Sequence, residues 1–181
     1  MSAIRLIVGL GNPGTQYEGT RHNAGAFFVR LLAKRHGLSL NPDRNALGDS
    51  ARGVIAGHDL RLLVPETYMN ESGRSVAAMS RYYRIEPDAI LIAHDELDIP
   101  AGESRFKHDG GHGGHNGLRD IIPALGGHRD FWRLRIGIGH PGSAKKVSAW
   151  VLSKASTADQ VSVEASIEAA ISALPLLLDG E

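Results

Sequence analysis

Hydrophobic and polar positions follow two different periods along the chain, and together they predict strands and helices in mixed order. Short segments with strand patterns, several of them apolar runs rich in branched side chains, lie at residues 4–10, 51–56, 60–64, 89–93, 103–107 and 132–139. Apolar residues with helical spacing occur at residues 24–36, 72–83, 117–125 and from about 158 onward. The last segment spaces its apolar residues like one face of a helix: Val163, Ile167, Ile171, Leu174 and Leu178.

This mixture of strands and helices predicts an α/β fold. The two strands at 51–56 and 60–64 flank the turn Gly57-His58-Asp59 and should pair antiparallel, so a mixed twisted sheet between helices is expected. Residues 41–49 are polar and contain Pro42 and Gly48, which predicts a loop. Since no internal repeat or linker divides the chain, residues 1–181 are expected to form a single domain.

Composition narrows the classes of protein and of chemistry. The chain has no cysteine, which excludes disulfides, thiolate catalysis and sulfur-ligated metals. No window approaches about eighteen uncharged apolar residues, and the N-terminus has no pattern of a signal segment. A cytoplasmic protein without a membrane partner is therefore expected.

The net charge of zero conceals an uneven distribution. Residues 101–150 carry eight Lys or Arg against four Asp or Glu, whereas residues 151–181 carry one Lys against five acids. A basic middle section suits a polyanionic partner that is contacted locally. Charge alone favours the plainer interpretation, an ordinary solvated face.

The chain is organised around residues 6–25, where a buried strand runs into a glycine-rich loop and then a helix. Gly9, Gly11 and Gly14 satisfy GxGxxG, the pattern of dinucleotide-binding proteins. That site needs a helix opening at the last glycine and an acidic residue about twenty positions later. Here Pro13 occupies the loop, and no Asp or Glu lies between Glu18 and Asp43. A nucleotide-dependent oxidoreductase is therefore disfavoured.

Histidine and carboxylate side chains are the main candidates for chemistry. His22 lies at a helix start beside the glycine-rich loop, and Asp95 leaves the end of a predicted strand. If these strand ends meet, Asp95 can accept a hydrogen bond from one imidazole nitrogen while the other takes a proton from water. A purely structural role for His22 is equally open. His108, His112 and His115 have the spacing of metal ligands, but no carboxylate-bearing helix accompanies them, which disfavours a metal site.

Five segments together resemble the bacterial peptidyl-tRNA hydrolases. They read LIVGLGNPGTQYEGTRHNAG at 6–25, VPETYMNESG at 64–73, ILIAHDELDIPAG at 90–102, GGHGGHNGLRDI at 110–121 and RLRIGIGHPG at 133–142. The resemblance implies a three-layer α/β fold and cleavage of the ester that joins a peptide to the ribose of tRNA, which recycles tRNA lost prematurely from ribosomes. It also implies that no metal or cofactor takes part, and we expect a monomer. A non-catalytic RNA-binding module is the alternative.

The resemblance also assigns roles to residues at matching positions. It implies that His22 is the general base, that Asp95 keeps it basic and oriented, and that Asn12 positions the first amide of the peptide. Other positions match groups that line the site for the peptide and the terminal adenosine or that belong to the loop above it: Tyr17, Tyr68, Met69, Asn70, His115 and Asn116. Lys107 and Arg135 match the pair that grips the 5′-phosphate of tRNA, with Arg105 and Arg133 as possible neighbours.

Plainer interpretations exist for some of these residues: Met69 as core filler, Asn70 as a helix cap and Arg133 on a solvated face. The chain also departs from the family pattern at two places. Family members commonly continue into a short basic tail, whereas this sequence reaches Glu181 with an acidic end, so tRNA contacts from such a tail are left open. Ala144 stands where a lysine is often found, although Lys145 and Lys146 follow it directly.

Overall fold

A computed structural model describes residues 3–180 and contains one seven-stranded sheet. Its elements, in chain order, are β1 (Leu6–Gly9), α1 (Ala24–Arg35), β2 (Asn41–Asp43), β3 (Gly48–Ile55), β4 (His58–Pro65), α2 (Ser72–Tyr83), β5 (Ile90–Glu96), β6 (Ser104–His108), α3 (Asn116–Ala124), β7 (Trp132–Gly137), α4 (Val147–Val151) and α5 (Thr157–Leu178). Five short 3-10 turns complete it: η1 (Thr15–Tyr17), η2 (Arg21–Asn23), η3 (Met69–Glu71), η4 (Pro87–Ala89) and η5 (Ala144–Lys146).

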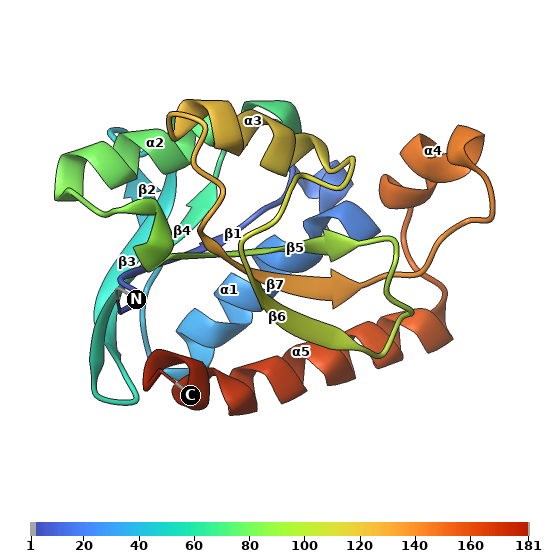
Figure 1. The fold of residues 1–181 in the computed structure, drawn as a ribbon. Helices are drawn as coiled ribbons and strands as arrows, with labels where there is room; N and C mark the ends of the chain where they lie inside the picture. The colour runs from blue at the N-terminus through green and yellow to red at the C-terminus, as the bar shows by residue number, and fades with distance from the viewer. Residues whose placement is uncertain (1–2, 181) are drawn as a thin grey trace.

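The strands follow the order β2-β3-β4-β1-β5-β7-β6. The central strands β4, β1, β5 and β7 are parallel, and the antiparallel pairs β2–β3, β3–β4 and β6–β7 lie toward the edges. Helices α2 and α3 cover one face and α1 and α5 the other (Figure 1). The predicted α/β fold, with a mixed sheet between two helical layers, is thereby confirmed.

Alternation along β1 explains the two cores. Leu6 and Val8 face α2 and α3, whereas Ile7 faces α1 and α5, because successive side chains of a strand point to opposite faces. The predicted apolar face of α5 belongs to the second of these cores, where Ile167 and Leu174 are fully buried.

By length and composition alone, α5 could cross a membrane, with a mean hydropathy of 1.6. One such helix is weak evidence for a membrane span; 28% of its most apolar window is buried, and those buried residues pack beneath the sheet.

Two local predictions need correction. Residues 41–49 are not a loop, since β2 and the beginning of β3 pair there, with Pro42 opposite Asp49. Proline is tolerated because β2 is an edge strand, where half of the backbone groups need no partner. The hairpin turns at Ala56 and Gly57, both with positive φ, and His58 already pairs with Ile55 in the ladder. Such a two-residue turn matches the twist of the strands.

Candidate active site

The candidate site lies where β1 and β5 end beside one another, as parallel strands do in ligand-binding α/β sheets. The loop after β1 leads through η2 directly into α1. Two glycines let this helix start lie against the strands: a Cβ at Gly9 would collide with the carbonyl of Gly25, and one at Gly25 with the carbonyl of Ala93. This close approach brings His22, on η2, next to Asp95, on β5.

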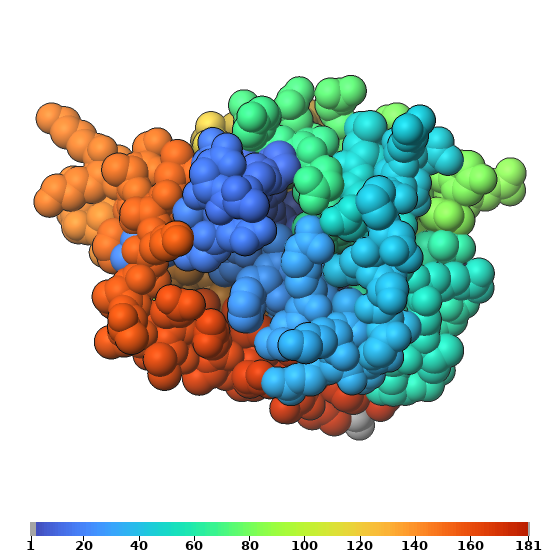
Figure 2. Space-filling view, turned by 180° about the vertical axis from the view of Figure 1, so that it is seen from behind, coloured from blue at the N-terminus to red at the C-terminus, as the bar shows by residue number. Residues whose placement is uncertain are grey.

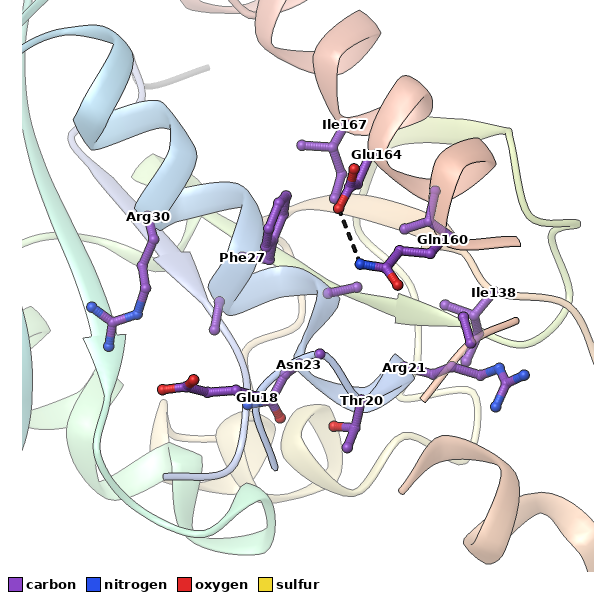
Figure 3. A pocket seen from close by; sticks show the side chains of 15 residues that line it. Glu18, Thr20, Arg21, Asn23, Phe27, Arg30, Ile138, Gln160, Glu164 and Ile167 are labelled. Carbon is purple, nitrogen blue, oxygen red and sulfur yellow. Dashed lines mark hydrogen bonds between the residues drawn. The ribbon is translucent and has the colours of Figure 1, made fainter. Parts of the chain in front are cut away.

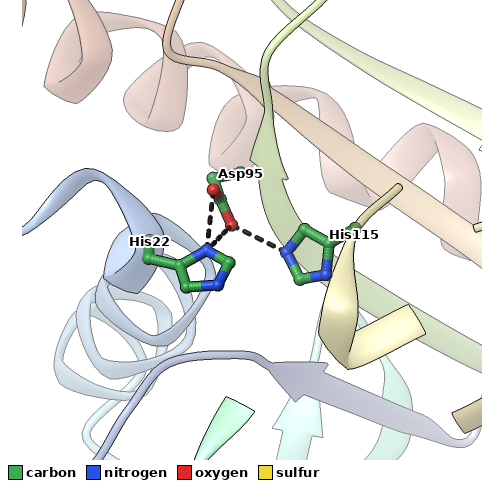
Figure 4. Close-up of side chains that lie close together, drawn as sticks. All are labelled: His22, Asp95 and His115. Atoms are coloured by element: carbon green, nitrogen blue, oxygen red, sulfur yellow. Dashed lines mark hydrogen bonds and ion pairs between the residues drawn. The ribbon is translucent and has the colours of Figure 1, made fainter. Parts of the chain in front are cut away.

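His22 and Asp95 are directly hydrogen-bonded (Figure 4). Nδ1 of His22 lies 2.9 Å from both Oδ1 and Oδ2 of Asp95. Both side chains are almost fully buried, at 8% and 2% exposure. A carboxylate can only accept a hydrogen bond, so Nδ1 of His22 carries the proton and donates a hydrogen bond to Asp95. In the neutral ring, Nε2 is then the basic nitrogen. The condition set by the sequence analysis, that the two strand ends bring these side chains together, is therefore met.

A third side chain, His115, shares the same carboxylate. Its Nε2 lies 2.8 Å from Oδ1 of Asp95, and its ring centre is 5.0 Å from that of His22. Its Nδ1 accepts hydrogen bonds from the backbone N–H groups of Gly117 and Leu118, at 3.1 and 3.3 Å. His115 therefore caps the N-terminus of α3 while it donates to Asp95, which the sequence did not indicate.

The electrostatics of this cluster favour a charged Asp95. Burial alone would raise the pKa of Asp95, but the imidazoles of His22 and His115 lower it well below its ordinary value. Burial would lower the pKa of His22, yet the charge of Asp95 and its hydrogen bond outweigh burial, so the pKa of His22 is raised above 6.5. His22 thus becomes a stronger base than a free imidazole.

His94 adds a second buried ring behind this cluster. Its Nδ1 donates to the backbone carbonyl of Asp95 at 2.8 Å, and its ring packs edge-on against His115. Burial, together with the neighbouring His115, lowers the pKa of His94 to about 4. His94 is therefore neutral at physiological pH, and its Nε2 is buried with no hydrogen-bond partner among residues 3–180.

Asn12 is held so that one end of its amide makes no hydrogen bond within residues 3–180. Its Oδ1 accepts from the backbone N–H of Met69 at 2.7 Å, and its own backbone forms a reciprocal pair with the side chain of Asn23. Since the oxygen is occupied, the Nδ2 group is the part of the Asn12 amide that can donate to a ligand.

Three other residues expected around the site, Tyr17, Tyr68 and Asn70, lie on the loop after β1 and on the segment after β4. Tyr17 and Tyr68 face one another edge-on with ring centres 6.5 Å apart, and Tyr68 is 55% exposed. Asn70 is exposed on η3 and makes no capping hydrogen bond in the described part of the chain, residues 3–180. The N-terminus of α2 is instead capped from α3, because Asp120 accepts from the N–H of Gly73 at 2.7 Å.

Met69 and Asn116 differ in accessibility. The side chain of Met69 is buried in the core with Leu10 and Leu118, which agrees with the core-filling interpretation. What Met69 gives the site is its backbone N–H, which holds Asn12. Asn116 is exposed at the first turn of α3, where its Oδ1 lies 3.4 Å from Arg119.

Four basic side chains share one face of the β6–β7 pair. Lys107 is directly opposite Arg133, and Arg105 is opposite Arg135. Opposed residues of an antiparallel pair point to the same face. Lys107 and Arg105 are exposed, whereas Arg135 is half-buried, with its Nε 2.9 Å from Oε1 of Glu96.

The interpretation of Arg133 as part of a solvated face is wrong. It is 2% exposed, and its guanidinium donates to the backbone carbonyls of Phe131, Arg129 and Gly110. Burial lowers the pKa of Arg133 to about 10, so the side chain stays charged at neutral pH. Arg133 therefore anchors the glycine-rich segment between β6 and α3.

The turn that carries His22 is also tied to α4, which stands away from the sheet (Figure 1). The guanidinium carbon of Arg21 lies 3.3 Å from the ring centre of Trp150, and its Nη1 donates to the carbonyl of Trp150. The N–H of Arg21 donates to the carbonyl of Ser153. No motif in the sequence indicated this connection.

The spacing of His108, His112 and His115 does not correspond to a cluster. His108 packs on Trp132, and His112 accepts from the N–H of Gly114. Within residues 3–180, the one group of possible metal ligands is His22, Asp95 and His115, whose ligand atoms lie within 4.8 Å of one another. Their nitrogen–oxygen distances of 2.8 and 2.9 Å are those of direct hydrogen bonds, with no space for an ion between the atoms.

A separate cavity of about 370 Å³ lies behind η2, where α1 and α5 approach each other (Figure 3). On the molecular surface it belongs to the face where the segment containing η1, α1 and α5 meet (Figure 2). Its wall is mainly apolar and includes Phe27, Val163 and Ile167. Neither His22 nor Asp95 lines it, so this cavity is not the candidate site.

The fold and the site together define an α/β protein with a buried histidine–aspartate pair beside a basic surface. A family model described as peptidyl-tRNA hydrolase matches residues 6–181. A peptidyl-tRNA hydrolase of Pseudomonas putida is 58% identical over 181 residues, which are 100% of this chain and 93% of that protein. One from Psychrobacter cryohalolentis is 58% identical over 99% of this chain and 92% of its own length.

Solved structures point to the same family as the sequence comparisons. The peptidyl-tRNA hydrolase of Acinetobacter baumannii superposes with a TM-score of 0.96 at 56% identity, covering 99% of this chain and 91% of that one. The chain belongs to the peptidyl-tRNA hydrolase family. A 5′-methylthioadenosine nucleosidase of Arabidopsis thaliana, with a TM-score of 0.60 and 11% identity, shares the fold alone.

Proposed function

We propose that this protein hydrolyses the ester between a peptide, or an N-blocked amino acid, and tRNA, with His22 as the general base. Membership of the family supports the reaction. The observation that supports the role of His22 is its Nδ1, which lies 2.9 Å from both oxygens of the buried Asp95 and leaves Nε2 as the basic nitrogen. The reaction recycles tRNA that was released prematurely from ribosomes.

In the proposed mechanism, Nε2 of His22 takes a proton from water as the water oxygen attacks the ester carbonyl. Asp95 stabilises the imidazolium that forms. When the tetrahedral intermediate collapses, the bond from the acyl carbon to the ribose oxygen breaks, and the imidazolium returns its proton to that oxygen. The free Nδ2 of Asn12 donates to the substrate acyl group, where a neutral donor suits a developing oxyanion.

The basic face of β6–β7 is the proposed contact for the tRNA phosphate. Lys107 offers an exposed charge, and Arg135 is a diagonal neighbour across the strand pair. Tyr17, Tyr68, Asn70 and Asn116 are proposed to contact the peptide or the terminal adenosine. We propose further that the protein acts in the cytoplasm, as a monomer and without a metal or cofactor.

The decisive experiment follows release of acetylated amino acid from charged tRNA by the His22→Ala variant. We expect turnover to fall at least about a hundredfold, because general base catalysis contributes about 10²–10⁴, while affinity for tRNA stays close to that of the unmodified protein. His36→Ala is the matched control, since His36 is an exposed histidine at the end of α1. Near-normal cleavage by His22→Ala would remove this mechanism.

Two further arms test the alternatives. Unblocked aminoacyl-tRNA should be a poor substrate, and treatment with a chelator should leave the rate unchanged. If the unmodified protein binds tRNA but does not release acetylated amino acid, the non-catalytic RNA-binding module is the correct interpretation.

A further inference from the structure

His115 occupies a position that joins the start of α3 to the carboxylate beside His22. We propose that His115 is a positioning residue: by donating a hydrogen bond to Asp95, it sets how strongly that carboxylate holds the proton on His22. Because the same ring caps α3, this effect depends on the position of the start of α3. The inference rests on the proposed function, because it concerns the strength of the same base. It differs from the role expected for His115 in substrate binding.

The two hydrogen bonds of His115 permit one tautomer. Nδ1 accepts from the N–H groups of Gly117 and Leu118, so it carries no proton. The proton must then be on Nε2, which donates to Oδ1 of Asp95 at 2.8 Å. With an exposure of only 8%, the ring is held in this orientation by protein groups at both nitrogens.

Asp95 consequently divides its charge between two donors. Oδ1 lies within hydrogen-bonding distance of both His22 and His115, whereas Oδ2 lies near His22 alone. A donor on a carboxylate stabilises the anion and weakens its pull on a second proton. Removing the donation from His115 should therefore strengthen the attraction of Asp95 for the proton on His22.

The groups that face His115 do not provide another donor to Asp95. The His94 ring packs on it from β5, but its Nδ1 is used by the backbone carbonyl of Asp95. The His22 ring faces it from η2. Glu96, the next residue of β5, pairs with Arg135, and Arg119 on α3 reaches Asn116.

The segment before His115 explains how its position can depend on the surroundings. Asp109, Gly110, Gly113 and Gly114 all have positive φ, and Arg133 donates to the carbonyls of Gly110 and Gly111. The N–H of His115 itself donates to the carbonyl of His112. The hydrogen bonds from Arg133 therefore fix the position of this segment, and with it the contacts of His115 with the start of α3 and with Asp95.

Two substitutions separate the two functions of the ring. In His115→Asn, the side-chain oxygen can replace Nδ1 as a helix cap, which asparagine performs well, but the shorter side chain does not reach Asp95. In His115→Gln, the terminal NH₂ can replace Nε2 as the donor to Asp95. The readouts are the NMR titration midpoint of the His22 ring, the pH dependence of kcat/KM, and urea unfolding.

We expect His115→Asn to raise the His22 midpoint by about 0.5 to 1 unit, with stability close to that of the unmodified protein. At pH values below this midpoint, kcat/KM should fall about threefold to tenfold, because a rise of 0.5 to 1 unit in the midpoint lowers the fraction of neutral His22 by that factor. His115→Gln should keep the midpoint near its original value. A purely structural His115, acting only as the cap of α3, would lower stability in His115→Gln and leave the His22 midpoint unmoved in both variants.

An unshifted or lowered midpoint in His115→Asn would overturn the inference, as would an equal shift in the two variants. The titration of His22 is read without substrate, so it does not depend on hydrolysis. If His22→Ala remained active, the proposed function would fail while the titration result for His115 would still stand.

Discussion

Replacing Asp95 by asparagine tests the central pair with almost no change of shape. Asp95 accepts from Nδ1 of His22 and from Nε2 of His115, so both oxygens serve as acceptors. In Asp95→Asn one of these atoms becomes an NH₂ group, which cannot accept. If the amide nitrogen faces His22, Nδ1 must become the acceptor and the proton moves to Nε2, where the base is needed.

The magnitude follows from the role of the base. A ring with the proton on Nε2 cannot deprotonate water, so the loss approaches the whole contribution of general base catalysis, about 10²–10⁴ in kcat. At about 1.36 kcal/mol per factor of ten, this corresponds to roughly 3–5 kcal/mol of barrier.

The direction of the pH dependence follows from the pKa of His22. In the unmodified protein, activity increases as the pH rises through the raised pKa, because the neutral ring is the base. Without the charge of Asp95, burial remains and lowers that pKa, so the acid limb of the residual activity should move to lower pH.

The assay is release of acetylated amino acid from tRNA, measured as kcat and kcat/KM between about pH 5 and pH 9, the range around the histidine pKa. Asp98→Asn is the matched control, since Asp98 is exposed and follows Asp95 in the same segment. That control should retain the activity and pH profile of the unmodified protein. A kcat for Asp95→Asn within about threefold of normal, or an acid limb moved to higher pH, would refute this reasoning.

Other perturbations test the surroundings of the site. Replacing Lys107 and Arg135 together by alanine should weaken tRNA binding and flatten its salt dependence, and an unchanged slope would place the phosphate contact elsewhere. Arg21→Lys keeps the charge but loses the planar contact with Trp150, so thermal stability and kcat should both fall. Unchanged values would show that the contact between Arg21 and α4 contributes to neither. Asp120→Ala removes the acceptor for the N–H of Gly73 and should lower the free energy of unfolding in urea by about 0.5–2 kcal/mol; an unchanged value would show that this carboxylate does not stabilise α2.

Much of the fold could be predicted because local pattern and tertiary packing agree. The apolar run through Leu6 and Val8 is buried on both faces, and the helical spacing from Val163 to Leu178 matches the face of α5 beneath the sheet. Residues 41–49 were wrongly predicted because pairing at an edge strand depends on a neighbouring strand, which local polarity does not reveal.

The candidate site divides in the same way. His22 and Asp95 could be predicted as a pair because each follows or ends a buried strand, and parallel strands deliver such residues to one edge. The residues missed were those whose partners come from distant segments: His94 behind His115, and Asp120 capping α2.

The sequence by itself determined the alternation of strands and helices, the absence of cysteine chemistry, and the candidate base with its carboxylate. The tertiary structure alone decided that His115 shares Asp95, that Arg133 is buried and that the free end of Asn12 is its NH₂ group. The physical reason is that patterns along the chain report which side chains are buried and where strands end. The proton on an imidazole and the orientation of an amide depend instead on which atoms from remote segments face them.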